Sequence, residues 1–276
     1  VYQNLMFPLE APRRKRTYSK ESREERVREV AAMLGIAELL QRYPRELSGG
    51  QKQRVALGRT LVRRPKAYLL DEPIAHLDAK LRHRMRAELK KIQREMGITT
   101  LYATPDQLEA MAMGDTVAVL HKGKIEQVGT PDEIYYKPSN LYVAEFVGDP
   151  PMNILPVDYR GEYAVVECDP PYQIPISNES QRLLTEKNVE HQLKVGLRPK
   201  DIKMVPASDP RAHAQGTVSL IDTLGQTSIV TVVFGKSEIK AKINSNDLPE
   251  LHSKIGLEYD INSLYFFDAT TGIRVC

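Results

Sequence analysis

Paired cysteines and long apolar runs are both scarce in this sequence. Its 276 residues include two cysteines, Cys168 and Cys276, which lie far apart and outside any Cys-x-x-Cys or Cys/His cluster. Neither a disulfide framework nor a zinc site is indicated, and a reducing, cytosolic setting fits best. No stretch approaches the roughly 20 apolar residues that a membrane-spanning helix needs. Any membrane role is therefore expected to be peripheral.

A strong charge of one sign is also lacking. The 39 Lys and Arg residues against 36 Asp and Glu leave a formal net charge of only +3. This balance is too weak to indicate nucleic-acid binding, so no nucleic-acid partner is expected. The length favours two domains, each with its own core. Because the first residue is Val1 and not Met, we expect the natural start to lie upstream.

Residues 1–46 have the pattern of a helical segment. Ser22 with Glu25 is typical of a capping box that begins a helix, and Gly35 is expected to end it. The basic run at 13–16 predicts an exposed, solvated turn, which is a commoner role for such runs than a lipid contact. A second short helix is expected over 37–42.

From residue 47 helices and short apolar strands alternate, which is typical of a parallel sheet covered by helices. Strands are expected at 67–70, 99–103 and 117–120. Between the first two, apolar residues repeat at helical spacing and predict a long helix that Gly97 ends. These residues are Leu81, Met85, Leu89, Ile92 and Met96.

The remainder changes in character. A hairpin turn is expected at 121–124, and a helix that Thr130 caps with Pro131 at its first position. Past residue 150, short β-type runs such as 163–166, 227–234 and 264–267 are separated by Gly, Pro and Asn. They predict a small all-β domain with a barrel-like form.

The most informative segment is the octet LSGGQKQR at 47–54, which opens a helix. Gly49 and Gly50 would let a ligand approach the backbone closely, and Ser48 adds a hydroxyl donor. The following helix directs its positive end toward the same place, so the arrangement suits a phosphate group. A bare Ser-Gly-Gly would more often be a helix cap in a tight turn.

Two adjacent acids, Asp71 and Glu72, follow the apolar run at 67–70. They lie at the carboxyl end of the expected strand, the edge where open α/β sheets bind ligands. Because successive strand residues point to opposite faces, the two acids cannot perform the same task. A lone Asp-Glu pair without such a strand would be interpreted as two acids in a solvated loop.

These segments resemble the motifs of ABC ATPases. The octet is similar to the signature motif, residues 67–73 to the Walker B motif, and residues 75–78 to the D-loop. The resemblance implies that Asp71 holds Mg²⁺ through water, that Glu72 orients and deprotonates the attacking water, and that Asp78 belongs to the catalytic set.

In this family two subunits bind two ATP molecules between them, each ATP lying between the P-loop side of one subunit and the signature of the other. The resemblance therefore implies that the signature contacts ATP held by a second subunit. The residues concerned are Ser48, Gly49, Gly50 and Gln51.

The resemblance extends along the chain to importers of the maltose type, carried by GTP at 129–131, FVG to MN at 146–153, GLRP at 196–199 and FD to TG at 267–272. It implies an α/β, P-loop NTPase-like ABC ATPase domain at 1–149 without its Walker A part. A helical subdomain would cover about 1–62 and a Walker B core about 63–149, followed at 150–276 by a transport-associated OB-type β domain.

The same resemblance implies partners and a location. A second ATPase subunit, in a heterodimer or a homodimer, would accompany the chain, with two transmembrane permease subunits and, indirectly, an extracytoplasmic solute-binding protein. It would act at the cytoplasmic face of the cell membrane, and the transported solute is expected to be a carbohydrate.

The sequence departs from the family at the phosphate site. No Gly-x-x-x-x-Gly-Lys-Ser/Thr occurs in it, so no P-loop is present to cradle the phosphates, and the chain alone is expected to be inactive. Gln3 is one candidate for the Q-loop glutamine of the family. We favour aligning residues 1–9 with the stretch after that loop, because Phe7-Pro8-Leu9 follows at once.

A second departure is internal. Pro105 stands where the family has its switch histidine, and it is expected to be non-functional because its side chain neither donates nor accepts hydrogen bonds. We expect Thr104 to cap the next helix, with Pro105 at its first position and Gln107 completing a capping box. The fold would survive while the catalytic hydrogen bond is lost.

This pattern favours a subunit that pairs with a different ATPase subunit and completes the partner's site. A catalytically silent scaffold or regulator is the alternative. A DNA-repair or translation ABC ATPase is disfavoured, because neither long heptad segments nor a basic tail is visible.

Overall fold

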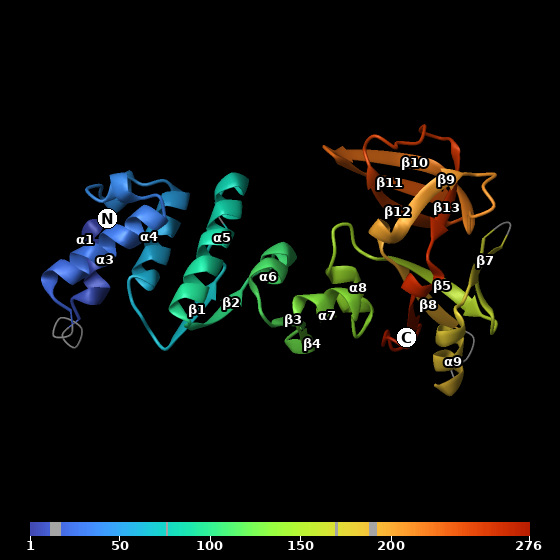
Figure 1. The fold of residues 1–276 in the computed structure, drawn as a ribbon, viewed down its shortest axis with the longest axis horizontal. Coiled ribbons are helices and arrows are strands. Elements are labelled where there is room, and N and C mark those ends of the chain that lie inside the picture. Colours follow the sequence, from blue (N-terminus) through green and yellow to red (C-terminus); the bar gives the residue numbers. More distant parts are fainter. Residues whose placement is uncertain (12–17, 76, 169–170, 188–191) are drawn as a thin grey trace. The chain divides into compact units, whose positions relative to one another are not determined.

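The computed structural model describes residues 1–11, 18–75, 77–168, 171–187 and 192–276. They form two compact units, which we name unit 1 (Val1–Asp115) and unit 2 (Thr116–Cys276) (Figure 1). The expected basic turn at 13–16 and His76 of the expected D-loop lie outside the described residues. Within the described ranges, no helix combines the length and the apolar character needed to cross a membrane.

Unit 1 begins with helices that pack around one core. Their bounds are α1 (Tyr2–Met6), η1 (Phe7–Leu9), α3 (Lys20–Met33), η2 (Ala37–Leu39), η3 (Pro44–Glu46) and α4 (Gly49–Leu61). The fully buried Leu5 and Leu34 both lie against Gly58 of α4. A β-carbon at Gly58 would lie 2.8 Å from Leu5 Cδ2, so the missing side chain is what lets the helices approach.

The start of α3 differs from the prediction. The N-cap is Ser19, whose hydroxyl accepts a hydrogen bond from the backbone N–H of Ser22 at 3.1 Å. The capping box expected at Ser22 is therefore wrong, because Lys20 and Glu21 already extend the helix in front of it. The predicted end is confirmed, since α3 stops at Met33 and Gly35 has φ +58°.

A two-stranded parallel sheet forms the second part of unit 1. It consists of β1 (Ala67–Asp71) and β2 (Thr99–Ala103), joined by α5 (Ala79–Met96) and followed by α6 (Gln107–Met113). The register places Leu69 beside Leu101 and Asp71 beside Ala103. One face of α5 is buried, as predicted, and Gly97 ends the helix in the left-handed conformation.

Unit 2 begins with the predicted hairpin. β3 (Val117–His121) and β4 (Lys124–Gly129) pair in antiparallel fashion across Lys122 and Gly123, both of which have positive φ. α7 (Pro131–Tyr136) and α8 (Leu141–Phe146) follow. Thr130 and Glu133 form the capping box of α7, with Pro131 at its first position, which confirms the prediction. The strand expected at 117–120 is thus present. Its expected place in the parallel sheet is wrong, because it pairs antiparallel with β4 in a separate sheet.

The rest of unit 2 contains two five-stranded antiparallel sheets around one core. In sheet order, the first has β14 (Tyr265–Asp268), β8 (Gln192–Leu197), β5 (Asn153–Tyr159), β6 (Tyr163–Val166) and β7 (Tyr172–Pro175). The second has β12 (Ser237–Asn244), β11 (Thr227–Phe234), β10 (Ala214–Leu224), β13 (Lys254–Tyr259) and β9 (Ile202–Pro206). α9 (Asn178–Glu186), η4 (Pro199–Asp201) and η5 (Ile261–Ser263) complete the elements. The β-rich prediction agrees, although no pattern predicted α9.

Two buried polar side chains tie unit 2 together. The Asn153 amide donates to the Leu197 carbonyl at 3.1 Å and to the Lys240 carbonyl at 2.8 Å, and its oxygen accepts from the Lys240 N–H at 2.8 Å. Since Lys240 belongs to the other sheet, this amide links the two sheets. Arg198 donates to carbonyls of the α7 and α8 segments, which holds them to the end of β8. The domain boundary expected at 149/150 stays a prediction.

Candidate functional site

The signature segment lies at the start of α4, and it caps that helix. Ser48 is the N-cap: its hydroxyl accepts from the Gln51 N–H at 3.3 Å, and the Gln51 side-chain oxygen accepts from the Ser48 N–H at 2.9 Å. Ser48 is exposed. A hydroxyl that accepts a bond keeps its own hydrogen, which it can donate to a ligand. The cap and a ligand-binding role are therefore compatible.

Gly49 is not required by the packing of this chain. No atom lies within 4 Å of the position that a β-carbon on Gly49 would occupy, whereas Gly58 of the same helix has Leu5 at 2.8 Å and Leu34 at 3.0 Å. Space is thus left open at the helix start, where unpaired backbone N–H groups and the helix dipole favour an anion. The first turn of α4 has the chemistry of a phosphate-binding turn.

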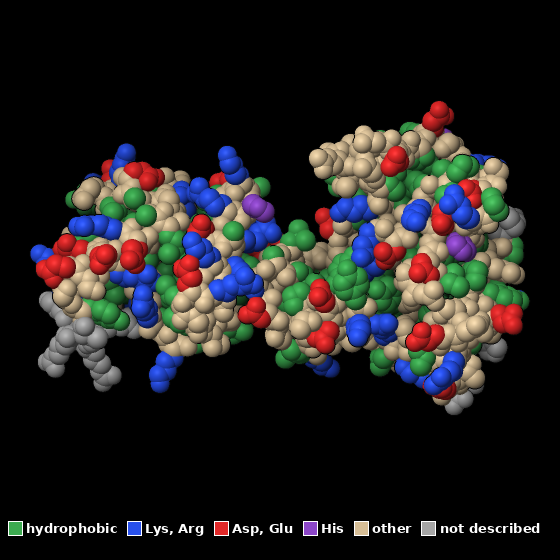
Figure 2. All heavy atoms as spheres, viewed as in Figure 1, with side chains coloured by type: hydrophobic (Ala, Val, Ile, Leu, Met, Phe, Trp, Pro, Cys, Tyr) green, Lys and Arg blue, Asp and Glu red, His purple; other side chains and the backbone are tan. Residues whose placement is uncertain are grey.

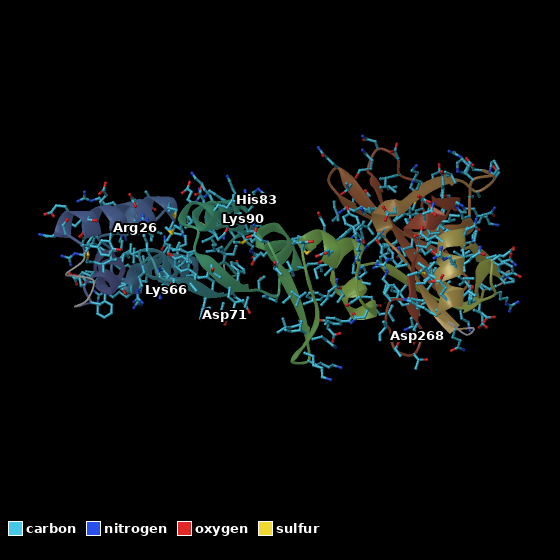
Figure 3. The ribbon with its side chains drawn as sticks, turned by 60° about the horizontal axis from the view of Figure 1, so that its bottom comes forward. Arg26, Lys66, Asp71, His83, Lys90 and Asp268 are labelled. Atoms are coloured by element: carbon cyan, nitrogen blue, oxygen red, sulfur yellow. The ribbon has the colours of Figure 1, made fainter. Side chains whose placement is uncertain are left out.

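The two acids stand at the end of β1, as predicted. Asp71 is the last residue of the strand and is exposed on the same side as Leu69, which is 74% exposed, and it lies at the margin of unit 1 (Figure 3). Glu72 follows with φ +42°, a left-handed conformation that is uncommon for a residue with a side chain. Regular strand geometry therefore ends between the two acids.

Hydrogen bonds from three segments hold the Glu72 backbone. Its N–H donates to the Ala103 carbonyl of β2 at 2.9 Å. Its carbonyl accepts from the Ala75 N–H at 3.3 Å and from the Gln53 side-chain amide at 3.1 Å. Gln53 belongs to α4, so the signature helix is joined directly to the Glu72 turn. Sequence reasoning missed Gln53, since no local pattern marks this contact between residues 19 positions apart.

Asp78 follows the Glu72 turn in the chain and begins α5. Its carboxylate caps α5 by accepting from the Leu81 N–H at 2.9 Å. Arg82 in the first turns of α5 donates to the carbonyls of Ala75 and Leu77, each at 3.2 Å, and its guanidinium lies 3.9 Å from the Asp106 carboxylate. Arg82 therefore connects the turn before Asp78 with the segment that follows β2.

Pro105 lies just ahead of α6 and is exposed. The predicted cap is wrong by two residues: the N-cap is Asp106, whose carboxylate accepts from the N–H groups of Leu108 and Glu109 at 2.9 and 3.3 Å. Asp satisfies two helix N–H groups here, and this leaves Pro105 outside the helix. Thr104 instead accepts from the Asp106 N–H at 3.1 Å.

A buried carboxylate supports the same segment. Glu109 is 2% exposed and accepts hydrogen bonds from the hydroxyls of Tyr102 at 3.0 Å and Thr104 at 2.8 Å. Burial, reinforced by the charge of Glu109, raises the pKa of Tyr102 well above its usual range. This cluster fixes the end of β2 to α6, next to Pro105. No local sequence pattern predicted this cluster.

The site offers one carboxylate that could help to hold the Mg²⁺ of a nucleotide, and no complete set of metal ligands is found among the described residues. Asp71 fits Mg²⁺, which is commonly held by one or two carboxylates together with water and phosphate oxygens; within the described ranges no side chain bonds its carboxylate. Among the described residues no group of three His, Cys, Asp or Glu side chains could hold a metal on its own. Basic and acidic side chains are interspersed over the visible face (Figure 2).

Comparison with known proteins agrees with this site. The family model described as ABC transporter matches residues 1–75, which include both the signature and the two acids. The trehalose/maltose import ATP-binding protein of Thermococcus litoralis is 41% identical, over 99% of this chain and 73% of its own length. The multiple sugar-binding transport ATP-binding protein of Streptococcus mutans is 38% identical, over 98% of this chain and 74% of its own.

A further relative, the sn-glycerol-3-phosphate import ATP-binding protein of Cupriavidus pinatubonensis, is 38% identical over 100% of this chain and 74% of its own length. The likeness thus runs through both units and not only through the motifs. The chain belongs to the ABC transporter family, as an ATP-binding subunit of the importer type.

Proposed function

We propose that the chain forms one half of an ATPase pair in an assembled importer, and that its signature turn caps the terminal phosphate of ATP held by the other half. The residues that would do so are Ser48, Gly49, Gly50 and Gln51. The observation that carries this proposal is the exposed start of α4, where Gly49 leaves open space that the fold does not need. An anion approaching there would meet backbone N–H groups and the positive end of the helix.

The acids serve the chain's own side of the pair. Asp71 would hold Mg²⁺ through water, and the ion would neutralise phosphate charge when bound. Glu72 would orient and deprotonate the attacking water, and Asp78 would act at the interface between the subunits. The β- and γ-phosphates need a P-loop, and the 276 residues contain none.

The chain's own site is expected to turn over slowly. A histidine at the switch position could hydrogen-bond a phosphate or a water, whereas Pro105 cannot. A pair in which both sites carried this proline would be a weak ATPase. We therefore expect a heteromeric pair, in which this chain completes the competent site of a different subunit.

The wider setting follows from the relatives. Two transmembrane permease subunits would bind this chain at the cytoplasmic face of the membrane, through helices near residues 5–45, and a solute-binding protein would contact the permeases. The transported solute is a carbohydrate, as the names of the maltose and multiple-sugar relatives suggest. Residues 150–276 would form an OB-type, transport-associated domain for contact between subunits and for regulation, with the ATPase domain ending at 149.

The test compares two substitutions in the reconstituted transporter. Ser48→Arg fills the space at the start of α4 and is expected to lower the ATPase rate by about tenfold or more. Glu72→Gln is expected to change it by less than about twofold, because it acts on the slow site. A larger effect of Glu72→Gln than of Ser48→Arg would show that the heteromeric proposal is wrong. If neither variant changed the rate, the chain would be a scaffold or regulator of a second ATPase subunit.

A further inference from the structure

Gln53 joins two segments that the proposed function assigns to different nucleotides. The signature turn faces the partner's ATP, while Glu72 belongs to the chain's own site. The Gln53 amide nitrogen donates to the Glu72 carbonyl at 3.1 Å, from a position two residues beyond Gln51. We propose that Gln53 is a positioning residue that holds the signature helix in register with the Glu72 turn, so that the two segments move together. This inference rests on the proposed function of both segments.

The Glu72 turn needs external support. A residue with a side chain at φ +42° occupies a sparsely populated region, and such conformations persist when the surroundings fix them. Two of the supporting bonds, to Ala103 and Ala75, come from the turn's own neighbourhood in β2 and the D-loop segment. The third comes from Gln53 and is the one that reaches the turn from a different helix.

The helix that carries Gln53 is itself fixed. Arg54, the next residue, donates to the carbonyls of Leu34 at 3.2 Å and Gly35 at 2.8 Å, which ties the first turns of α4 to the end of α3. Val55, Leu57 and Leu61 of α4 are buried in the core of unit 1. Because Ser48 and Gln53 lie on one rigid helix, a shift of the signature turn moves the Gln53 side chain with it.

The coupling runs in both directions. If ligand binding at the signature turn draws α4 toward the partner, the Gln53 bond pulls on the Glu72 carbonyl and so on the peptide that orients the acid. Conversely, a shift of the Glu72 turn would be transmitted through the Gln53 hydrogen bond to the start of α4. The two ATP sites of the pair would then be linked through one side-chain amide within this chain.

The first arm of the test is amide hydrogen exchange on the full chain, which needs no partner. Gln53→Ala is expected to increase exchange at the N–H groups of Glu72 and Ala75, while the amides of α4 beyond residue 55 keep their protection. Lys52→Ala, a change at the neighbouring exposed position of α4, is the matched control and should alter neither. Unchanged exchange at Glu72 and Ala75 in Gln53→Ala would overturn the proposal.

The second arm measures ATP hydrolysis in the reconstituted transporter. Gln53→Ala is expected to lower kcat by about fivefold, because the signature turn at the partner's competent site loses its register with the Glu72 turn. KM for ATP should stay within about twofold, because no group proposed to bind ATP is removed. Gln53→Glu, which keeps the length but loses the N–H donor, should behave like Gln53→Ala. Unchanged kcat in Gln53→Ala, with faster exchange in the first arm, would overturn the positioning role.

The two proposals fail separately. Ser48→Arg, run beside these variants, reports whether the signature turn takes part in hydrolysis at all. If Ser48→Arg leaves the rate unchanged, the proposed function is wrong whatever Gln53 does. If Ser48→Arg stops hydrolysis and Gln53→Ala leaves kcat unaltered, only the further inference is wrong.

Discussion

Ser48 and Gln51 hydrogen-bond each other in both directions, side chain to backbone, at 3.3 and 2.9 Å. The same hydroxyl that is assigned to a phosphate therefore also begins the helix. A substitution at Ser48 can act through the fold, through the ligand, or through both. Variants are informative only when they separate the two roles.

Ser48→Asn makes this separation. Asn is as good an N-cap as Ser, so the free energy of unfolding should change by no more than a few tenths of a kcal/mol, whereas Ser48→Ala should lower it by about 1 kcal/mol. Both variants remove the hydroxyl donor and should lower the ATPase rate of the assembled transporter to a similar degree. Urea denaturation and a rate assay measure the two effects. Full activity in Ser48→Asn would mean that the hydroxyl serves only as a cap.

Alanine substitutions at two glycines of α4 should have opposite effects on the free energy of unfolding. Gly49→Ala meets open space and should be neutral or stabilising by up to about 0.5–1 kcal/mol, since Ala loses less backbone entropy than Gly in a helix. Gly58→Ala forces a methyl group against Leu5 and Leu34, both fully buried, and should destabilise unit 1 by about 1–3 kcal/mol. Denaturant midpoints distinguish them.

The ATPase rates of these two variants should follow the opposite order to their stabilities. Gly49→Ala places a side chain where the partner's phosphate is proposed to lie, so its ATPase rate in the assembled transporter should fall although its fold is intact. Gly58→Ala should keep the rate per folded molecule. An active Gly49→Ala transporter would contradict the assignment of the signature turn.

Local patterns predicted most of the fold. The strand at 99–103 and the long helix closed by Gly97 were correct because each is set by its own apolar spacing and end signal. The two helix starts that were wrong, at Ser22 and Thr104, share a cause. In each case another capping residue stood within three positions, Ser19 and Asp106, and the spacing alone does not say which one the chain uses.

The site was predictable in its motifs and not in its connections. Asp71 and Glu72 could be placed at a strand end, since β1 is a clear apolar run. The left-handed conformation of Glu72 and its bond to Gln53 depend on how α4 packs beside β1, which no local pattern encodes. The buried Glu109 is hidden for the same reason, because its partners Tyr102 and Thr104 are supplied by the end of β2.

Pro105→His tests the slow site. In a transporter in which a P-loop completes the chain's own site and Ser48→Arg blocks the competent site, an imidazole at position 105 should raise the residual ATPase rate by about tenfold or more, as expected for a positioned acid–base group. Because Pro105 is exposed and lies outside α6, the fold should lose less than about 1 kcal/mol. Pro105→Ala, which changes the backbone in the same way without adding an imidazole, should give no gain. A gain in both variants would assign the effect to the backbone.

The pH dependence of unit 2 should be set partly by Tyr172 and Tyr259, whose hydroxyls hydrogen-bond each other inside the β core. Burial raises the pKa of both, that of Tyr259 to about 12. Below the unfolded value of about 10 both states are neutral; above it the unfolded chain ionises first, so stability falls as pH rises through about 12. Denaturant unfolding at pH 8–11.5 measures this loss. Tyr172→Phe with Tyr259→Phe should flatten the alkaline limb, and an unchanged limb would assign it to other groups.

Arg198 should contribute far more to unit 2 than its neighbour Lys200. Its guanidinium donates to the carbonyls of Tyr135 at 2.7 Å, Ala144 at 3.2 Å and Val147. These carbonyls lie at the carboxyl ends of α7 and α8, where a positive charge interacts favourably with the helix dipole. Arg198→Met would remove the guanidinium donor from these three carbonyls, two of them in buried contacts, and should lower the free energy of unfolding by about 2–4 kcal/mol.

Lys200→Met is the matched control. The Lys200 ammonium group lies over the rings of Tyr135 and Tyr136 at 5.2 and 4.7 Å, but it is exposed, so its loss should change stability by less than about 1 kcal/mol. Hydrogen exchange shows where the effect occurs. In Arg198→Met the amides of 131–148 should exchange faster while those of the sheets keep their protection, because Arg198 joins this segment to β8. Equal protection of both regions in Arg198→Met would mean that apolar packing alone holds the two helices, and that Arg198 is buried there without serving as their tether.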